Sequence, residues 1–317
     1  MKKIAVLTQA YNAESTLPHA MDSVLAQSYP HLIYFLLDSA STDGTWRVIN
    51  EYARRDSRVV LLRNTFNRLS AYIDRIPEIA DAAGKDGLFA MLDADDAYHT
   101  DAFEKMLGFM NDRRLDISSC GARHISVTTG RAMKSGVHEG DTVYERERFG
   151  YYYPEYWQVM STVWGKLFSC ATLMKCDFTT ARSFTIGADT AFTLEAVKHT
   201  ERFGILEEAL YDYYIYPNSI LRRFDDSRAG DGRNYYETAF DFLNAVNGLS
   251  DYNKTFMMQV YFDIIRNSVG MTRDARINPS RVMRCLKTIF TDPLTREALM
   301  SDGISMSEKV DLITEVF

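Results

Sequence analysis

The segment LFAMLDADD, residues 88–96, is the most informative stretch of this 317-residue chain. Its first five residues are apolar, which indicates a short strand buried on both faces. Three carboxylates then follow within four residues, Asp93, Asp95 and Asp96, and they repel one another unless a cation lies among them. Carboxylate oxygens suit hard divalent ions such as Mg²⁺ or Mn²⁺, which proteins commonly share with substrate phosphates. The alternative is a solvated turn in which one aspartate caps a helix at about residues 100–110.

The residues before this segment alternate strand and helix patterns. Apolar runs at residues 4–7, 32–37 and 59–62 indicate three further buried strands. Apolar residues at helical spacing follow the first two runs, and Ser41-Thr42-Asp43 is expected to begin the second helix. Strands that alternate with crossover helices predict an α/β fold with a doubly wound, mostly parallel, Rossmann-like sheet.

The rest of the chain changes character twice. Residues 115–224 are less regular and rich in tyrosine and tryptophan. From about residue 225, apolar residues follow helical stripes, for example across residues 256–265 and 282–289. We therefore divide the chain into residues 1–224 and a helical C-terminal appendage, residues 225–317.

The composition narrows the class of protein. Apolar residues make up 46% and charged residues 25%, as in ordinary globular proteins, and the net charge of -7 argues against a nucleic-acid binder. The four cysteines have no CxxC spacing and no histidine nearby in the sequence, so we expect isolated thiols in a reducing compartment. No apolar run is long enough to span a membrane. These features predict a cytoplasmic protein, with membrane contact at most peripheral, at the inner face.

Polar residues follow three of the predicted strands. Residues 8–12 follow the first, residues 38–45 the second and residues 93–96 the fourth. Ligands of open parallel sheets bind at the carboxyl ends of the strands, so these clusters are expected to meet at one edge. Asp38 ends an apolar strand, where a carboxylate has no packing purpose, and a nucleoside partner explains it better. Asp43 fits equally well as an acid at the positive end of a helix dipole.

A later acid, Asp189, lies in the sequence Gly187-Ala188-Asp189-Thr190 at the start of an apparent helix. It can be a helix-start acid. It can also be a general base, which requires a carboxylate within hydrogen-bond reach of an acceptor hydroxyl. The aromatic residues 151–157 can likewise stack on sugar rings, fill the core or form a partner surface.

In this order, the clusters resemble a family 2 glycosyltransferase of the nucleotide-diphospho-sugar (A-type) fold, over residues 3–224. The resemblance implies that Asp95 carries a divalent metal and the diphosphate, and that Asp189 is the catalytic base. It also implies that Trp164 and Lys166 line the acceptor side. The residues that it assigns to the nucleotide-sugar are Thr8, Ala10, Tyr11, Asn12, Asp38, Ser41, Asp43, Asp93, Ala94 and Asp95.

What the resemblance implies is an inverting transfer of a sugar, with a UDP-sugar as the default donor. Residues 1–115 would bind the nucleotide and residues 116–224 the acceptor, a saccharide or lipid-linked saccharide. Bacterial cell-surface polysaccharide synthesis is the setting that the family suggests. The helical appendage leaves open a homo-oligomer formed through it.

Several positions depart from the family pattern. Gln9 replaces the usual proline, Ser39 a second aspartate and Ala188 an acid, while Tyr214 and Tyr216 stand where an arginine and a histidine are common. Nearby basic residues, Arg222 and Arg223, could supply the missing charge. These departures leave a lapsed sugar-nucleotide-binding or scaffold protein as an alternative. A sugar nucleotidyltransferase is a second alternative, but it needs a glycine-rich basic loop after the first strand, and residues 8–15 contain neither residue type.

Overall fold

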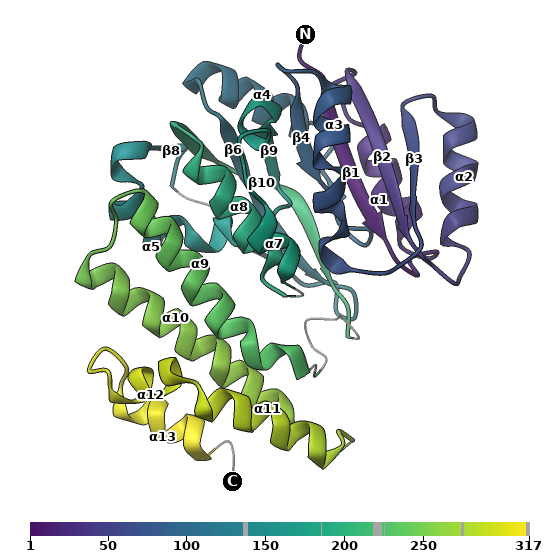
Figure 1. Ribbon diagram of the computed structural model, residues 1–317. Coiled ribbons are helices and arrows are strands. Elements are labelled where there is room, and N and C mark those ends of the chain that lie inside the picture. Colours follow the sequence, from purple (N-terminus) through teal and green to yellow (C-terminus); the bar gives the residue numbers. More distant parts are fainter. Residues whose placement is uncertain (136–138, 185, 218–223, 225, 274–275, 315–317) are drawn as a thin grey trace.

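A ten-stranded sheet forms the centre of the protein in the computed structural model, which describes residues 1–135, 139–184, 186–217, 224, 226–273 and 276–314. The strand order is β3-β2-β1-β4-β9-β6-β10-β5, with β7 beside β6 and β8 beside β10 (Figure 1). The strands are β1 (Ile4–Ala10), β2 (Leu32–Ser39), β3 (Val59–Asn64), β4 (Leu88–Met91), β5 (Ala97–Tyr98), β6 (Ile117–Ser126), β7 (Ala132–Ser135), β8 (Thr142–Glu145), β9 (Lys166–Ser169) and β10 (Arg202–Ile215).

The sheet is mixed, although most of its paired residues run in parallel. Strands β3, β2, β1 and β4 are parallel to one another, and so are β6 and β10. The short strand β9 joins the two groups and runs antiparallel to both β4 and β6. The predicted α/β class with a mostly parallel, doubly wound sheet is therefore confirmed. The antiparallel β9 was not predicted, because four residues carry too little pattern to indicate a strand and its direction.

Helices cover both faces of the sheet because alternate strand residues point to opposite sides. In β1, Ile4 and Val6 face a core formed with α1 (Leu17–Leu25), α2 (Thr45–Arg55) and α4 (Ala102–Arg113). Ala5 and Leu7 face the other core. That core is covered by η1 (Leu69–Arg75), α3 (Ile76–Ala83), α5 (Phe149–Met160), α6 (Cys170–Leu173), α7 (Thr179–Ser183) and α8 (Ala188–Lys198).

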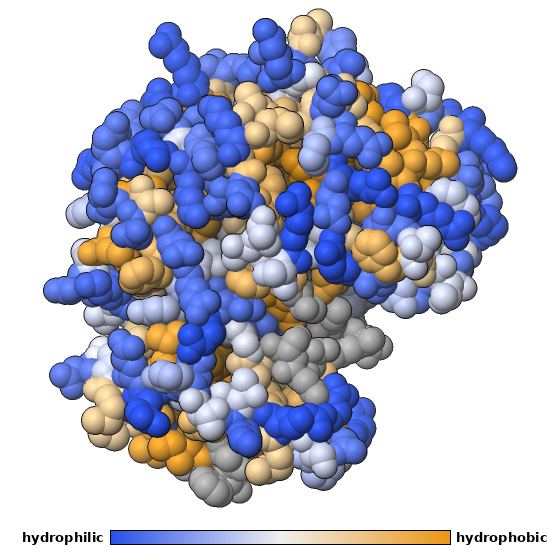
Figure 2. Space-filling view, in the orientation of Figure 1, coloured by the Kyte–Doolittle hydropathy of each residue, from blue (hydrophilic) through white to orange (hydrophobic). Residues whose placement is uncertain are grey.

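At the β2–β3 edge this second core is thinner. Ile33 and Val60 are only partly buried there, and Figure 2 shows apolar residues reaching the surface beside α3.

Two predicted helix starts are shifted. The second helix begins at Thr45 rather than Ser41, because residues 41–44 form a loop that bonds to residues 12–14. The helix expected from about residue 100 begins at Ala102.

The C-terminal part is helical, as predicted. It contains η4 (Asp226–Gly230), α9 (Asp231–Ala245), α10 (Asp251–Gly270), η5 (Met271–Arg273), α11 (Pro279–Thr291), α12 (Pro293–Met300) and α13 (Met306–Thr314). Within the described residues, no helix combines the length and apolarity that a membrane span requires.

Helix α10 connects two cores. Met257 and Val260 join the core under α5 and α8, whereas Phe262 and Ile265 face a separate core shared with α11, α12 and α13. The loop before α10 approaches α5 closely, since a Cβ built on Gly150 would lie 2.3 Å from the Gly248 Cα. Helices α9 and α10 thus share their packing with residues 149–203, and the division at residue 224 stays a prediction.

The aromatic stretch at residues 151–157 lies in α5, mostly facing the protein interior. Tyr153 and Tyr156 are fully buried. The Tyr156 hydroxyl donates to the Phe149 carbonyl at 2.8 Å, and the Tyr153 hydroxyl lies 3.1 Å from that of Tyr235. Tyr151 alone of this group is strongly exposed. Core packing therefore accounts for the most buried of these rings.

Candidate active site

The predicted polar clusters meet at the carboxyl edge of the parallel strands. Ala10 at the end of β1 is opposite Asp38 at the end of β2. Beyond them, the Asn12 side-chain oxygen accepts from the Thr42 amide at 2.8 Å, and the Asn12 amide donates to the Ser41 hydroxyl at 3.0 Å. On the other side of β1, β4 runs parallel and leads directly into the acidic turn. One edge therefore carries all three clusters.

Within the acidic turn, Asp96 is an anchor rather than an exposed ligand. It is fully buried, and its two oxygens accept from the Tyr211 hydroxyl at 2.9 Å and the Tyr214 amide at 2.8 Å. The Tyr211 hydroxyl also accepts from the Asp93 amide at 3.3 Å. Strand β10 thus holds the turn in place, while Asp95 remains exposed and Asp93 is partly buried.

The electrostatics of the turn favour a bound cation. Burial, with the charges of Asp189 and Asp95, raises the pKa of Asp93 to about 8. Desolvation by the surrounding residues also raises the pKa of Asp95, although its side chain stays accessible to solvent. A cation between such carboxylates would remove the repulsion that disfavours their charged forms. The donor set, all carboxylate oxygen, fits Mg²⁺ or Mn²⁺.

Asp189 faces this turn from the first turn of α8. It is partly buried, and its Oδ1 accepts from the Tyr72 hydroxyl at 2.8 Å. Burial raises the pKa of Asp189, while the bond from Tyr72 and the charge of Lys166 lower it. The influence of Asp189 on the pKa of Asp93 follows from their proximity across the edge. The structure therefore brings the predicted base and the acidic turn into one electrostatic site.

Asp38 is fully buried at the end of β2. Its Oδ1 accepts from the Ser41 amide at 3.1 Å. Its Oδ2 lies 3.2 Å from the Arg63 Nε, but in a geometry that makes no hydrogen bond within the described structure. A cavity of about 360 Å³ opens beside it, lined by Ala40, Ser41, Arg63, Asn64 and Thr65. Asp38 does not line this cavity itself, but it contacts Ser41 and Arg63, which do.

Other residues assigned to the nucleotide-sugar have different surroundings. Thr8 is buried, and its hydroxyl lies 2.9 Å from that of Tyr34, so its side chain serves the core; Ala10 is buried as well. Tyr11 is 47% exposed at the edge. Asp43 accepts from the Thr45 amide and hydroxyl at 3.0 and 2.6 Å, which supports its alternative role as a helix-start acid.

On the predicted acceptor side, Trp164 and Lys166 have different environments. Trp164 is partly buried and stacks on the Tyr211 ring, with centroids 4.5 Å apart. Lys166 points inward from β9 and is only 1% exposed. It was expected to line the acceptor side, but its side chain does not reach a surface. Its ammonium donates to the Thr162 hydroxyl at 3.0 Å and the Trp164 carbonyl at 3.2 Å. Burial lowers the pKa of Lys166 to about 7, against the opposing attraction of Cys120 and Asp189.

With this geometry established, comparison with known proteins identifies the family. The model of glycosyl transferase family 2 matches residues 5–177, more than half of the chain. The chain belongs to glycosyl transferase family 2. EpsH of Bacillus subtilis, which carries a provisional glycosyltransferase name, is 23% identical over 95% of this chain and 86% of its own length. The Escherichia coli enzyme WfaP, a UDP-Glc:alpha-D-GlcNAc-diphosphoundecaprenol beta-1,3-glucosyltransferase, is 28% identical over 37% of this chain and 46% of its own.

Solved structures agree on the fold of this family 2 glycosyltransferase. TarS of S. aureus, residues 1–349 in complex with UDP-GlcNAc, superimposes with a TM-score of 0.66 and 15% identity, over 99% of this chain and 89% of that one. The mannosyltransferase PcManGT of Pyrobaculum calidifontis, in complex with GDP-Man and Mn²⁺, superimposes with a TM-score of 0.55 and 13% identity. This match covers 99% of this chain and 87% of that one. At these identities the likeness supports the fold alone.

Two departures of this glycosyltransferase from the family pattern, Tyr214 and Tyr216, lie close to its acidic turn. The Tyr214 hydroxyl lies 3.2 Å from His19 Nε2, and Asp95 and Asp96 contribute to the raised pKa of Tyr216 after burial. Strand β10 is fixed there by Asp212, which binds Arg123 through two bonds of 2.6 Å and His99 at 3.1 Å. Burial alone would raise the pKa of Asp212, but these partners lower it. Arg222 and Arg223, which were expected to supply the missing charge, lie outside the described residues.

Three site residues were not predicted from the sequence. Arg63 is the penultimate residue of β3 at the same edge, and its guanidinium lies 4.7 Å from the centre of the Trp46 ring, beside Asp38. The rule that polar residues follow the strands could have found it. Tyr72 and Tyr211 carried no such signal, because a tyrosine in an irregular segment or a long strand usually indicates packing.

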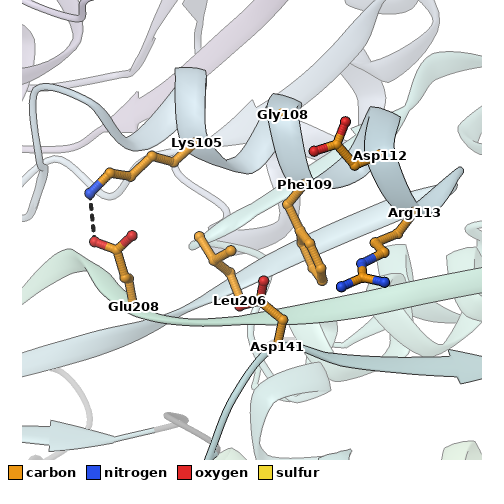
Figure 3. A pocket seen from close by; sticks show the side chains of 8 residues that line it. All are labelled: Lys105, Gly108, Phe109, Asp112, Arg113, Asp141, Leu206 and Glu208. Atoms are coloured by element: carbon orange, nitrogen blue, oxygen red, sulfur yellow. Dashed lines mark hydrogen bonds and ion pairs between the residues drawn. The ribbon is translucent and has the colours of Figure 1, made fainter.

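Two features outside this edge belong to other parts of the molecule. A cavity of about 450 Å³ lies between α4 and β10 and contains none of the predicted site residues (Figure 3). Contrary to the expectation of cysteines without histidine partners, Cys176 lies near Glu195 and His199, with donor atoms within 4.8 Å. Glu195 is already bound by Lys198 at 2.9 Å and His199 at 3.1 Å, so hydrogen bonds explain this cluster. None of the four cysteines forms a disulfide within the described residues.

Proposed function

We propose that this family 2 glycosyltransferase is an inverting, metal-dependent enzyme that moves a sugar from a UDP-sugar to a saccharide or lipid-linked saccharide. Cell-surface polysaccharide synthesis at the cytoplasmic side of the membrane is the proposed setting. One observation carries the proposal. Asp93 follows β4 at the sheet edge, and Tyr72, which bonds to Asp189, is held beside the neighbouring β1 by Gln9, so the two carboxylates from distant parts of the chain share one site. Burial, with the charges of Asp189 and Asp95, raises the pKa of Asp93 to about 8, in keeping with this proximity. A metal–diphosphate site and a base would then be neighbours.

The chemistry is a direct displacement. The acceptor oxygen forms a bond to the anomeric carbon, the bond from that carbon to the diphosphate breaks, and the nucleoside diphosphate leaves. The acceptor proton passes to Asp189, whose Oδ1 is already bound by Tyr72. We assign the proton to Oδ2, which has no hydrogen-bond partner among the residues that the structure describes. Attack opposite the leaving group inverts the anomeric carbon, and general-base help of this kind is worth about a hundred- to ten-thousand-fold in rate.

Asp95, with the donor's phosphates, would hold the divalent ion beside Asp93. When bound, the ion offsets the negative charge that grows on the leaving diphosphate. Asp93 would balance its charge, and Asp96 would keep the turn rigid through β10. The mannosyltransferase complexed with GDP-Man and Mn²⁺ supports a metal site in this fold.

A uridine donor is supported by two neighbours, TarS bound to UDP-GlcNAc and WfaP, whose name includes UDP-Glc. The name of WfaP also includes a lipid-diphosphate acceptor, which supports the proposed acceptor class. In this chain, the cavity lined by Ser41 and Arg63 would hold the nucleoside, with Asp38 behind it contacting both of these residues.

The test is a panel of nucleotide sugars incubated with the enzyme and Mn²⁺ or a chelator, with released nucleoside diphosphate as the readout. We expect release with UDP-sugars, dependent on Mn²⁺, and at least a hundredfold loss of transfer in Asp189→Asn with donor affinity nearly unchanged. NMR of a product made from an α-linked donor should show a β linkage. Transfer at the parent rate by Asp189→Asn would mean that another residue is the base.

The alternative function, a lapsed sugar-nucleotide-binding or scaffold protein, is motivated by Tyr214 and Tyr216 beside the acidic turn and by Ala188. Such a protein would bind the donor and release no nucleoside diphosphate. Slow hydrolysis of the donor with Mn²⁺, even in the absence of an acceptor, therefore separates the two functions.

A further inference from the structure

Gln9 uses both ends of its side-chain amide to hold the segment η1. It lies in β1, on the sheet face that η1 covers, and is partly buried. Its Nε2 donates to the Arg68 carbonyl at 2.7 Å, and its Oε1 accepts from the Tyr72 amide at 2.8 Å. The proline usual at this position in the family has no side-chain donor or acceptor and could form neither bond. Gln9 therefore makes two bonds that a proline at this position could not make.

Tyr72, the residue held by Gln9, reaches α8 with both parts of its side chain. It is 2% exposed. Its ring packs edge-on against Phe192, with centroids 5.7 Å apart, and its hydroxyl donates to Asp189 Oδ1 at 2.8 Å. Asp189 and Phe192 are three residues apart and lie on the same helix face. The ring contact thus fixes the position from which the hydroxyl bonds to the carboxylate.

A second set of contacts ties η1 to the segment that leads into α8. Asp74 is bound by Arg182 of α7 at 3.1 Å and also pairs with Arg68. The Ser70 hydroxyl donates to the Arg182 carbonyl at 3.4 Å. Because η1 is held on one side by β1 and on the other by α7, Tyr72 has little freedom to leave Asp189.

We propose that Gln9 and Tyr72 are positioning residues that orient Asp189 for proton abstraction, with Gln9 fixing η1 and Tyr72 binding one carboxylate oxygen. This inference rests on the proposed role of Asp189 as the base. We call the contacts from Gln9 through Tyr72 to Asp189 the relay; it passes on position, not protons. The relay leaves Oδ2 to receive the acceptor proton. It also stabilises the charged form of the carboxylate, which alone can act as a base.

The surroundings of Asp189 allow the contribution of Tyr72 to be isolated. The titratable groups that face it are Tyr72 from η1, Lys166 from β9 and Asp93 from the acidic turn. Arg182, from the neighbouring α7, is engaged by Asp74. Burial raises the pKa of Tyr72 well above its ordinary value, so its hydroxyl keeps its proton throughout the working range. Removing the hydroxyl therefore removes a donor and no charge.

The experiment follows the Asp189 carboxyl directly, by NMR of aspartate-labelled protein, with its resonance assigned from its loss in Asp189→Asn. The free energy of a hydrogen bond to a charged group corresponds to a pKa shift of about one unit. Tyr72→Phe should therefore raise the titration midpoint of Asp189 by about one pH unit. The acid limb of the kcat profile should move with it. The plateau kcat should fall about tenfold, with the donor KM within about twofold.

Gln9→Ala should change the titration and kcat in the same direction, and it should add nothing in a Tyr72→Phe background, because both act through one contact. Tyr156→Phe is the matched control, since it deletes a buried tyrosine hydroxyl bond remote from this edge. We expect it to lower thermal stability without moving either profile. An unmoved Asp189 titration in Tyr72→Phe, or additive effects of Gln9→Ala and Tyr72→Phe, would overturn the relay.

The two proposals fail in different ways. If Asp189→Asn transfers sugar at the parent rate, the base assignment is wrong and the relay has no catalytic role, although the titration still reports the hydrogen bond. If Asp189→Asn is inactive and Tyr72→Phe leaves the titration in place, the relay alone is wrong.

Discussion

Lys166 offers the sharpest physical test of this site. It is a fully buried amine with two neutral acceptors, the Thr162 hydroxyl and the Trp164 carbonyl, and burial lowers its pKa from 10.5 to about 7. We consider Lys166→Met, which keeps the length and removes the charge. Between pH 7 and 10.5 the unfolded chain binds more protons at Lys166 than the folded chain does. The stability of the parent protein should therefore rise with pH across this window, whereas the variant lacks this contribution.

The size of the effect follows from the two pKa values. Each pH unit between them corresponds to about 1.4 kcal/mol, so between pH 7 and pH 9.5 the parent should gain about 3 kcal/mol relative to Lys166→Met. For a chain of 317 residues, about 3 kcal/mol corresponds to a Tm difference of about 4 to 5 °C. Lys166→Met also loses two hydrogen bonds, which lowers its stability by about 1 kcal/mol each. This loss is the same at both pH values, so it does not alter the change in the stability difference with pH.

The assay is thermal unfolding of both proteins at pH 7 and pH 9.5 in a chelating buffer. Lys105→Met is the control, because Lys105 is partly exposed and its partners Asp101 and Glu208 raise its pKa. The difference between parent and this variant should therefore not change across this pH range. An equal Tm difference between parent and Lys166→Met at both pH values would refute the reasoning. We also expect slower transfer by Lys166→Met, since Asp189 loses a favourable charge.

Three further predictions address the metal, the support of the turn and the packing of the helical region. Asp95→Ala should abolish Mn²⁺-dependent donor binding, and unchanged affinity by calorimetry with Mn²⁺ present would contradict its role. Asp212→Asn should lower stability by about 2 kcal/mol at neutral pH. Because the folded-state pKa of Asp212 is lowered, the difference should disappear as the pH falls through that value, which urea unfolding from pH 7 to pH 3 can measure. Gly150→Ala should lower stability by about 3 kcal/mol, since the new Cβ would clash with Gly248. The control Gly108→Ala in α4, which has open space around its Cβ, should be neutral or stabilising. Equal Tm values for the two variants would refute this account.

Much of the fold and part of the site could be predicted from local patterns. Asp38 and Asp93 each come directly after an apolar run, and the carboxyl ends of parallel strands necessarily lie at one edge. The same logic applies to Arg63 at the end of β3, which the prediction overlooked. The helical stripes after residue 225 likewise needed only the spacing of apolar residues.

Other features depended on contacts between distant segments. Lys166 lies in a strand of four residues, and no local pattern shows whether such a side chain points to a surface or into the core. In residues 41–44, Asp43 bonds to Thr45 at the helix start, as one interpretation expected, whereas Ser41 and Gly44 bond to the loop after β1. The helix therefore begins later than Ser41, because these tertiary partners outweigh a weak local preference.

The sequence by itself determined the α/β class, the strand–acid junctions and the helical C-terminal region, because periodicity and burial act between neighbouring residues. Only the tertiary structure decided that Tyr72 donates to Asp189, that β10 holds Asp96, and that Lys166 is buried beside the base. These contacts join segments separated by many residues. Their geometry depends on how the helices pack against the two faces of the sheet, which no local pattern records.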